Sequence, residues 1–321
     1  MPSYPGISSE AFIHPLDREA EQTLRRVPGF EILSRSFVEF LYERPQHVYL
    51  LGNAIQASPR QYSTIYGIAR ECIRDLDVVP EPLLFVSQNA QANSYSLGRE
   101  QPHIILNTGL LDLLEEQEIR TIIARELGHI KCEHTTLRQM SLWAMNAASM
   151  LGDMTLGLGN LLSSGLLYAF YEWRHKAELS ADRAALLVID DLPTILKTMM
   201  KLAGGSAKYA QEISLAEFIR QGKNYQELDR DSFKEIYKFL LYNGGNNSFL
   251  THPFPVERIH YLEEWSTSPE YNRLRQGSYQ SGKSPGSVEE NDKASEDEVS
   301  RLQEQIERLK AEIHKVKSQG R

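Results

Sequence analysis

The sequence predicts a mainly helical domain with a small antiparallel β-sheet, followed by a C-terminal helix of the coiled-coil type. Over long stretches, apolar residues recur three and four positions apart, which is the spacing of one helical face. Only two short runs read as strands, and a polar segment containing Gly98 separates them. The chain has 321 residues, which is enough to bury a sizeable core.

Helices are predicted up to about Asp77, most clearly from the spacing of Ile65, Ile68, Ala69, Cys72 and Ile73. The two β-rich runs follow at 83–86 and 103–107. Because polar residues 93–98 lie between them, we expect the two runs to form an antiparallel sheet. Beyond the sheet, residues 110–136 are predicted to form one helix, or two joined at a bend. A second long helix is predicted over 166–189.

The composition changes after Tyr271. Residues 276–298 are rich in Gly, Ser, Glu, Asp and Lys and have almost nothing to bury. A heptad seam follows, formed by Val299, Leu302, Ile306, Leu309, Ile313 and Val316. We therefore predict a domain over 1–270, a disordered linker over 271–298 and a short coiled-coil helix over 299–318. Residues 299–316 are expected to form a weak homodimer; the alternative is that this helix folds back onto its own domain.

Composition and charge narrow the classes of partner and compartment. A net charge of −8 and an isoelectric point near 5.7 argue against a nucleic-acid partner, since phosphate binding needs a basic surface. The two cysteines are too few for a disulfide framework and suit a reducing compartment. The N-terminus lacks a basic region followed by an apolar run, so we expect a cytoplasmic protein.

One apolar stretch bears on membrane contact. Met154–Tyr171 is uncharged and close to the ~18 apolar residues of a membrane-spanning candidate. Glycine, serine and asparagine interrupt it, and Asp153 separates it from the apolar segment before it. A helical hairpin within the protein is the favoured interpretation, and peripheral membrane contact through 142–171 is the alternative.

The segment that carries chemistry is Arg125-Glu-Leu-Gly-His129, which differs at one position from H-E-x-x-H. In that motif, residues four apart share a helical face, so two imidazoles converge on one zinc while the glutamate faces the metal-bound water. Downstream, Glu178 and Asp182 again lie four apart on one helical face. A glutamate from a second helix is the third ligand that a catalytic zinc needs, and an aspartate behind it can brace a ligand.

Five features together resemble the soluble bacterial members of the M48 zinc metallopeptidases, over roughly residues 10–265. They are Asn93 before a Gly-containing strand turn, T-G-L-L at 108–111, E-L-G-H-I-K-x-x-H at 126–134, A-E-L-S-A-D-R-A at 177–184 and H-P-x-x-x-x-R-I at 252–259. The resemblance implies a zincin-like fold of the gluzincin type.

The resemblance also implies a role for each matching residue. His129 and Glu178 would be zinc ligands, and Glu126 the general base. Asp182 would support the first histidine of the motif from behind, and His252 would lie near the scissile carbonyl. The strand that contains Asn93, Ser94 and Tyr95 would offer its edge to an extended polypeptide substrate.

Arg125 departs from the family pattern. A guanidinium has no acceptor lone pair and a pKa above about 12, so it does not ligate zinc. We expect it to pair instead with the carboxylates around it, and zinc to bind more weakly. A rescue by Cys132 would need a bend in the helix, and His134 is expected to point away from His129. A single-base change in a His codon is the alternative origin of Arg125.

Three functions follow from these observations. The first is a zinc-dependent endopeptidase of M48 type whose activity Arg125 impairs. A pseudo-peptidase that binds extended polypeptides without cleaving them is the second. The third is a scaffold whose coiled-coil tail is the functional part, and it leaves the spacing of Glu126, Glu178 and Asp182 unexplained.

Overall fold

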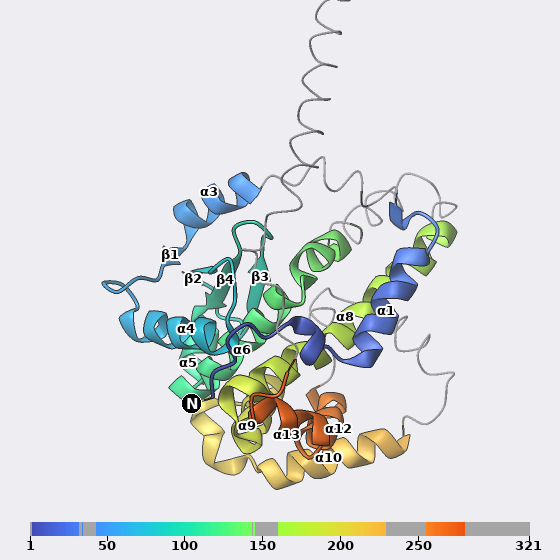
Figure 1. The fold of residues 1–321 in the computed structure, drawn as a ribbon. Coiled ribbons are helices and arrows are strands. Elements are labelled where there is room, and N and C mark those ends of the chain that lie inside the picture. The colour runs from blue at the N-terminus through green and yellow to red at the C-terminus, as the bar shows by residue number, and fades with distance from the viewer. Residues whose placement is uncertain are drawn as a thin grey trace, which may run out of the picture. The chain divides into compact units, whose positions relative to one another are not determined.

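The computed structural model shows a mainly helical unit with one small sheet (Figure 1). It describes residues 2–31, 34, 43–142, 144, 160–228 and 255–279. This confirms the predicted fold class. The predicted coiled coil, 299–318, and residues 280–298 of the predicted linker, 271–298, lie outside the described residues. So does most of 142–171.

The N-terminal part of the chain is helical, as the sequence predicts. Its elements are the 3₁₀ turn Ser9–Ala11, α1 (Pro15–Arg26), α3 (Glu43–Asn53) and α4 (Ser63–Leu76). Helix α1 begins with Pro15, and His14 caps it by accepting a hydrogen bond from the Leu16 backbone N–H at 3.2 Å. The cap fixes where the chain enters the helix.

The sheet has four strands in the order β1-β2-β4-β3: Ile55–Gln56, Leu83–Ser87, His103–Asn107 and Ser94–Leu97. Strands β2 and β4 pair in parallel, so the predicted antiparallel pairing of these two runs is wrong. The sequence between them forms its own strand, β3, which pairs antiparallel with β4 through a hairpin at Gly98. The hairpin reverses the chain a second time, which restores the direction of β2.

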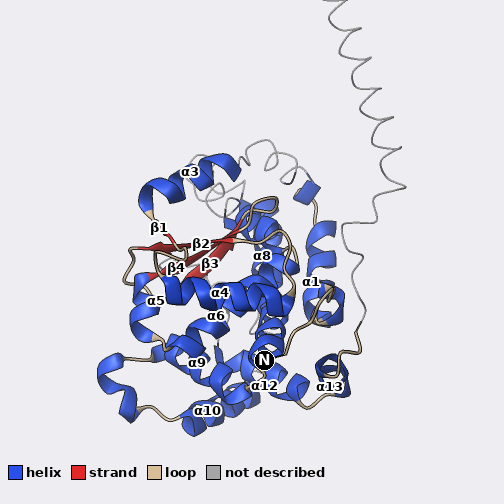
Figure 2. Cartoon of the chain, turned by 60° about the vertical axis from the view of Figure 1, so that its left-hand side comes forward, coloured by secondary structure: helices blue, strands red, loops and turns tan. Residues whose placement is uncertain are grey.

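The two faces of the sheet bury different side chains. On one face, Phe85 and Ile105 pack with Leu50 of α3. On the other, Leu84 and Ile104 join the main core with α4 and the helices beyond it. Figure 2 shows the sheet between α3 and the layer formed by α4 and α6.

Helices α5 (Thr108–Leu113), α6 (Glu116–Lys131), α8 (Asn160–Ile189) and α9 (Leu192–Gly204) form the centre. A capping box starts α6, in which the Glu115 backbone N–H donates to Glu118 Oε2 at 2.8 Å. Helix α6 ends at Lys131, and Glu133 adopts a positive φ of 57° before a further helical segment, 134–142. The predicted bend in 110–136 is therefore present.

The remaining elements cover the lower side in Figure 1: the 3₁₀ segment Ala207–Glu212, α10 (Leu215–Leu228), α12 (Pro255–Ser266) and α13 (Pro269–Arg275). Tyr271 and Leu274 of α13 are buried in the core, so the packed unit extends past residue 270. No helix of the described residues is both long enough and apolar enough to cross a membrane.

Candidate functional site

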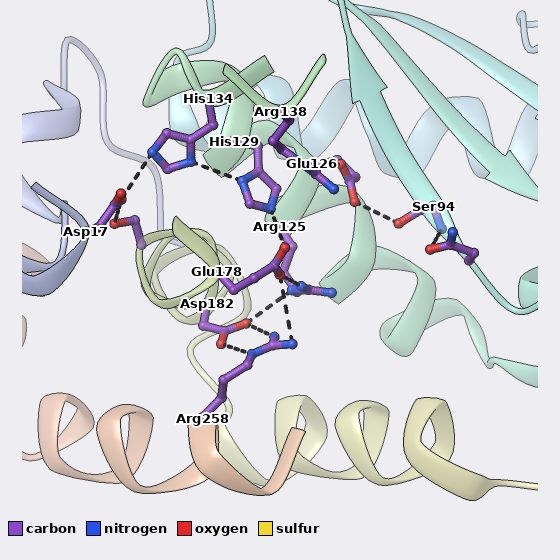
Figure 3. A network of polar contacts seen from close by, with 12 residues as sticks. Asp17, Ser94, Arg125, Glu126, His129, His134, Arg138, Glu178, Asp182 and Arg258 are labelled. Carbon is purple, nitrogen blue, oxygen red and sulfur yellow. Dashed lines mark hydrogen bonds and ion pairs between the residues drawn. The ribbon is translucent and has the colours of Figure 1, made fainter. Parts of the chain in front are cut away.

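The candidate site forms where α6 and α8 pack at Gly128. A Cβ at this position would lie 2.6 Å from the Cβ of Ala184, which is closer than real side chains approach. Glycine therefore allows the two helix backbones to come together. Their approach brings Arg125 and His129 of α6 against Glu178 of α8 (Figure 3).

Arg125 is held by two carboxylates of α8. Its Nε donates to Asp182 Oδ1 at 3.1 Å, and its Nη2 forms an ion pair with Glu178 Oε2. The Arg125 side chain is only 4% exposed, so the three charges interact out of water. This confirms the predicted pairing of Arg125 with the carboxylates around it.

Asp182 binds a second arginine, from α12. Arg258 donates through Nε to Asp182 Oδ2 at 2.6 Å and through Nη2 to Oδ1. Its Nη1 also lies 3.9 Å from Glu178 Oε2. Sequence reasoning placed Arg258 in a motif but gave it no role. The structure shows that it ties α12 to the site and shares both carboxylates with Arg125.

Arg125 keeps its charge in this setting. Burial by itself lowers the pKa of the guanidinium, but the negative charges of Glu178, Asp182 and Glu126 outweigh burial and raise it. Arg125 is therefore protonated over the whole working pH range and offers donors only. It occupies the first position of the H-E-x-x-H pattern as a fixed cation.

His129 and Glu178 lie as far apart as two ligands of one zinc ion would. His129 Nε2 lies 3.4 Å from Glu178 Oε1. Two donors bound to one tetrahedral zinc at about 2.0–2.1 Å would lie about 3.3 Å apart. Burial, and then the charge of Arg138, hold the pKa of His129 well below its usual value, so the imidazole is neutral and has a lone pair.

These side chains do not make a complete zinc site. A catalytic zinc takes three protein ligands and keeps one position for water, and here a cation with no lone pair stands at the place of the third ligand. Within the described part of the chain, no group of three or more His, Cys, Asp and Glu side chains is placed to hold a metal ion. His129 and Glu178 by themselves do not fit a resident catalytic zinc.

His134 lies against His129, so the expectation that it points away is wrong. The Nδ1 atoms of the two rings are 3.0 Å apart. A continuous helix would separate residues five apart, but α6 ends at Lys131 and the positive φ of Glu133 redirects the chain. The turn brings the His134 ring back to His129, where it shields that ring from the N-terminal helix.

The buried network continues into α1, which sequence reasoning missed. His134 Nε2 is 3.1 Å from Asp17 Oδ2, and the Ser180 hydroxyl donates to the same oxygen. Asp17 is fully buried although it lies in the first turn of α1, where acidic residues usually face solvent. No sequence pattern distinguishes it from an ordinary first-turn residue. Its partners are all distant in the chain.

Glu126 faces the sheet and not Arg125. Its Oε1 accepts from the hydroxyl of Ser94, the first residue of β3, at 2.8 Å, and its Oε2 lies 3.5 Å from Arg138 Nη1 (Figure 3). The carboxylate therefore sits at the junction between α6 and the start of β3. This is where a general base would meet a polypeptide on the edge of the sheet.

Strand β3 is an edge strand, since the sheet ends with it. Asn107 N donates to Asn93 O at 3.0 Å, which marks these two as a hydrogen-bonded pair. Because such pairs alternate along an antiparallel ladder, the backbone of Tyr95 faces β4 and that of Ser96 faces away from it, at the unpaired edge of the described sheet. Asn93 and Tyr95 are half-buried at this edge.

Two further residues that the sequence suggested for the site are His252 and Cys132. His252 lies outside the described residues. Cys132 caps the C-terminus of α6, and burial raises the pKa of its thiol well above the usual value. Among the described residues, Cys132 belongs to no group of side chains placed to hold a metal ion, so nothing in the geometry puts it in the place of the missing histidine.

Comparison with known proteins gives one family. The model of "Peptidase family M48" matches residues 59–266. The "Plastoglobule-localized metallopeptidase 48, chloroplastic" of Arabidopsis thaliana is 30% identical over 272 residues, which are 84% of this chain and 76% of that protein. No solved structure matches.

Bacterial relatives match over a shorter stretch. A "Protease HtpX homolog" of Thermoanaerobacter pseudethanolicus is 23% identical over 55% of this chain and 57% of its own length. The homolog of Dictyoglomus thermophilum is 26% identical over 58% of this chain and 66% of its own length. The chain thus spans 57% of one of these bacterial proteins and 66% of the other.

Proposed function

The chain belongs to peptidase family M48, and we propose that it binds extended polypeptides at β3 with severely reduced peptide hydrolysis. The observation that carries this proposal is Arg125. Its guanidinium stands at the position of a ligand and neutralises Glu178 and Asp182. These carboxylates would otherwise bind or support a metal ion.

The polypeptide site itself is retained. Glu126 bonds to Ser94 at the start of β3, and the Ser96 backbone faces the open edge beside it. An edge strand can pair with an extended chain through main-chain hydrogen bonds. Replacing the ligand histidine removes the metal from this site but leaves the groups that would hold a substrate.

The other two candidate functions rank lower for stated reasons. An active zinc peptidase needs the ligand set that Arg125 interrupts. A scaffold acting through 299–318 rests on residues outside the described part of the chain, and it gives no role to the buried network. A cytoplasmic location, with peripheral membrane contact through 142–171, remains part of the proposal. The name of the Arabidopsis relative places that protein in the chloroplast.

Peptide binding at the edge of β3 tests this function. The probe is a fluorescein-labelled, amidated decapeptide of alternating valine and threonine, measured by fluorescence polarisation. Ser96→Pro removes one N–H from the open edge and leaves the ladder to β4 intact. We expect it to weaken binding about three- to tenfold, the value of one main-chain hydrogen bond.

Ser96→Ala is the matched control, because it removes the hydroxyl and keeps the backbone N–H. It should bind the neutral peptide as the parent does. Circular dichroism would verify that both variants fold. Equal affinity of the Pro and Ala variants, or no binding by the parent chain, would contradict pairing along β3.

A further inference from the structure

A cavity of about 230 Å³ lies beside β3. Ser94 and Ser96 line it from the strand, Arg138, Gln139 and Leu142 from the helical segment 134–142, and Arg174 from α8. The cavity thus adjoins the edge at which an extended chain would pair. Its volume matches one side chain and not a second polypeptide strand.

Two guanidinium groups share this cavity. Burial, and then the nearby charge of Arg138, lower the pKa of Arg174 to about 10, so Arg174 remains charged near pH 7. Arg138 Nη1 lies 3.5 Å from Glu126 Oε2, which is a long contact. The other oxygen of Glu126 is bound by Ser94. The cavity wall thus carries two guanidinium groups, with Glu126 bound on its other side by Ser94.

Two buried polar atoms at the cavity lack hydrogen-bond partners in the described structure. They are Ser96 Oγ and Gln139 Nε2, on residues that are 2% and 7% exposed. Gln139 uses its Oε1 to accept from Gln46 at 3.4 Å, which leaves its amide N–H groups as donors. Buried donors without acceptors are uncommon in native proteins. They indicate that something else supplies an acceptor.

We propose that this cavity binds a carboxylate of the polypeptide held at β3, most directly an acidic side chain. The inference rests on the proposed function and names its substrate class. Side chains of a strand paired with β3 alternate between the two faces, so every second one turns toward the cavity side of the sheet. A carboxylate there accepts from Arg138, Arg174 and Gln139 together, and guanidinium groups match its planar geometry.

Peptide pairs that differ in one charge test the proposal on the full chain. The probe is the labelled, amidated decapeptide with one central Glu, compared with the same peptide carrying Gln. We expect the Glu peptide to bind at least about tenfold more tightly, as charge-assisted hydrogen bonds imply. A third peptide, with Gln and a free C-terminal carboxylate, shows whether the chain end fills the cavity instead.

Arginine variants assign the effect to the cavity. Arg174→Gln should reduce the advantage of the Glu peptide to below about threefold while the Gln peptide binds as before. Arg60→Gln is the control, because Arg60 is exposed and follows β1 at the opposite edge of the sheet. It should leave the advantage unchanged.

The outcomes separate this inference from the proposed function. One outcome is that the Glu peptide, the Gln peptide and the Gln peptide with a free C-terminus all bind the parent chain equally. The cavity then does not bind carboxylates, although pairing at β3 stands. If neither peptide binds, the proposed function itself fails. An advantage that survives in Arg174→Gln but is lost in Arg60→Gln would place the anion site elsewhere and overturn the assignment.

Discussion

At the scale of single residues, Arg125 changes the chemistry of the site that α6 and α8 form. Its neighbours Glu178 and Asp182 are buried, and buried carboxylates need a positive partner. A metal ion and its ligands would supply that charge in a peptidase, whereas here Arg125 and Arg258 supply it. The site therefore keeps its carboxylates without depending on zinc for folding.

Removing the Arg125 charge should destabilise the protein. Arg258 still holds Asp182 in Arg125→Leu, so the main change is the loss of the buried ion pair between residue 125 and Glu178. We expect the free energy of unfolding to fall by about 3–5 kcal/mol, the usual effect of breaking a buried pair. Urea denaturation in chelator-containing buffer measures this loss.

Arg220→Leu is the matched control, since it breaks the exposed pair with Glu217. That change should alter stability by less than about 1 kcal/mol. Equal urea midpoints of unfolding for the Arg125 and Arg220 variants would mean that the buried pairs contribute no more to stability than a surface pair does.

How far the site could be predicted differs between its residues. The pairing of Arg125 with α8 follows from fixed four-residue spacing on two helices, so the sequence was sufficient. The contact of His134 with His129 depends on the positive φ of Glu133, a conformation that nothing in the sequence marks. Asp17 reaches the site only through tertiary packing of α1 against α8, which a local pattern does not encode.

At the scale of elements, the helices were predictable and the sheet only in part. Apolar residues at helical spacing mark α4, α6 and α8 directly. The parallel pairing of β2 with β4 depends on β3 forming a strand of its own, although residues 93–98 are polar and short. The two buried positions of β3 are Ser94 and Ser96, so the strand lacks the apolar alternation that marks a strand in a sequence.

The N-cap of α1 should make stability depend on pH. His14 Nδ1 accepts the capping hydrogen bond, and protonation would remove that lone pair. Burial, and then the charge of Arg183, lower the pKa of His14 from 6.5 to about 4, against the opposing effect of Asp17. Between about pH 4 and pH 6.5, His14 is therefore protonated in the unfolded chain and neutral in the folded chain.

His14 therefore contributes stability above pH 6.5 that is lost as the pH falls through about 4. One such proton changes the free energy of unfolding by at most about 1.4 kcal/mol per pH unit. His14→Asn keeps a capping acceptor without titrating, so it should flatten the dependence while keeping stability at pH 7.

His14→Ala serves as the control, because it removes both the proton and the cap. It should flatten the pH dependence equally and also cost about 0.5–2 kcal/mol at pH 7. Urea denaturation at several pH values from 4 to 7 would compare the three proteins. A His14→Asn slope identical to that of the parent would exclude His14 as the titrating group.

At the scale of the whole molecule, one packed unit joins the family's motifs into a single buried network. The contacts run from Asp17 of α1 through His134 and His129 to the carboxylates of α8 and on to Arg258 of α12 (Figure 3). The heptad pattern of 299–316 stays a prediction, because it lies outside the described residues. The proposed activity depends on the packed unit alone.

Zinc content tests the central claim most directly, because that claim attributes the missing third ligand to Arg125. The purified parent chain and Arg125→His would be dialysed against equimolar zinc and measured by atomic emission, with casein cleavage recorded alongside. We predict well under one zinc per molecule and little cleavage in the parent, and about one zinc with chelator-sensitive cleavage in Arg125→His. Stoichiometric zinc and robust, chelator-sensitive proteolysis in the parent chain would contradict the account.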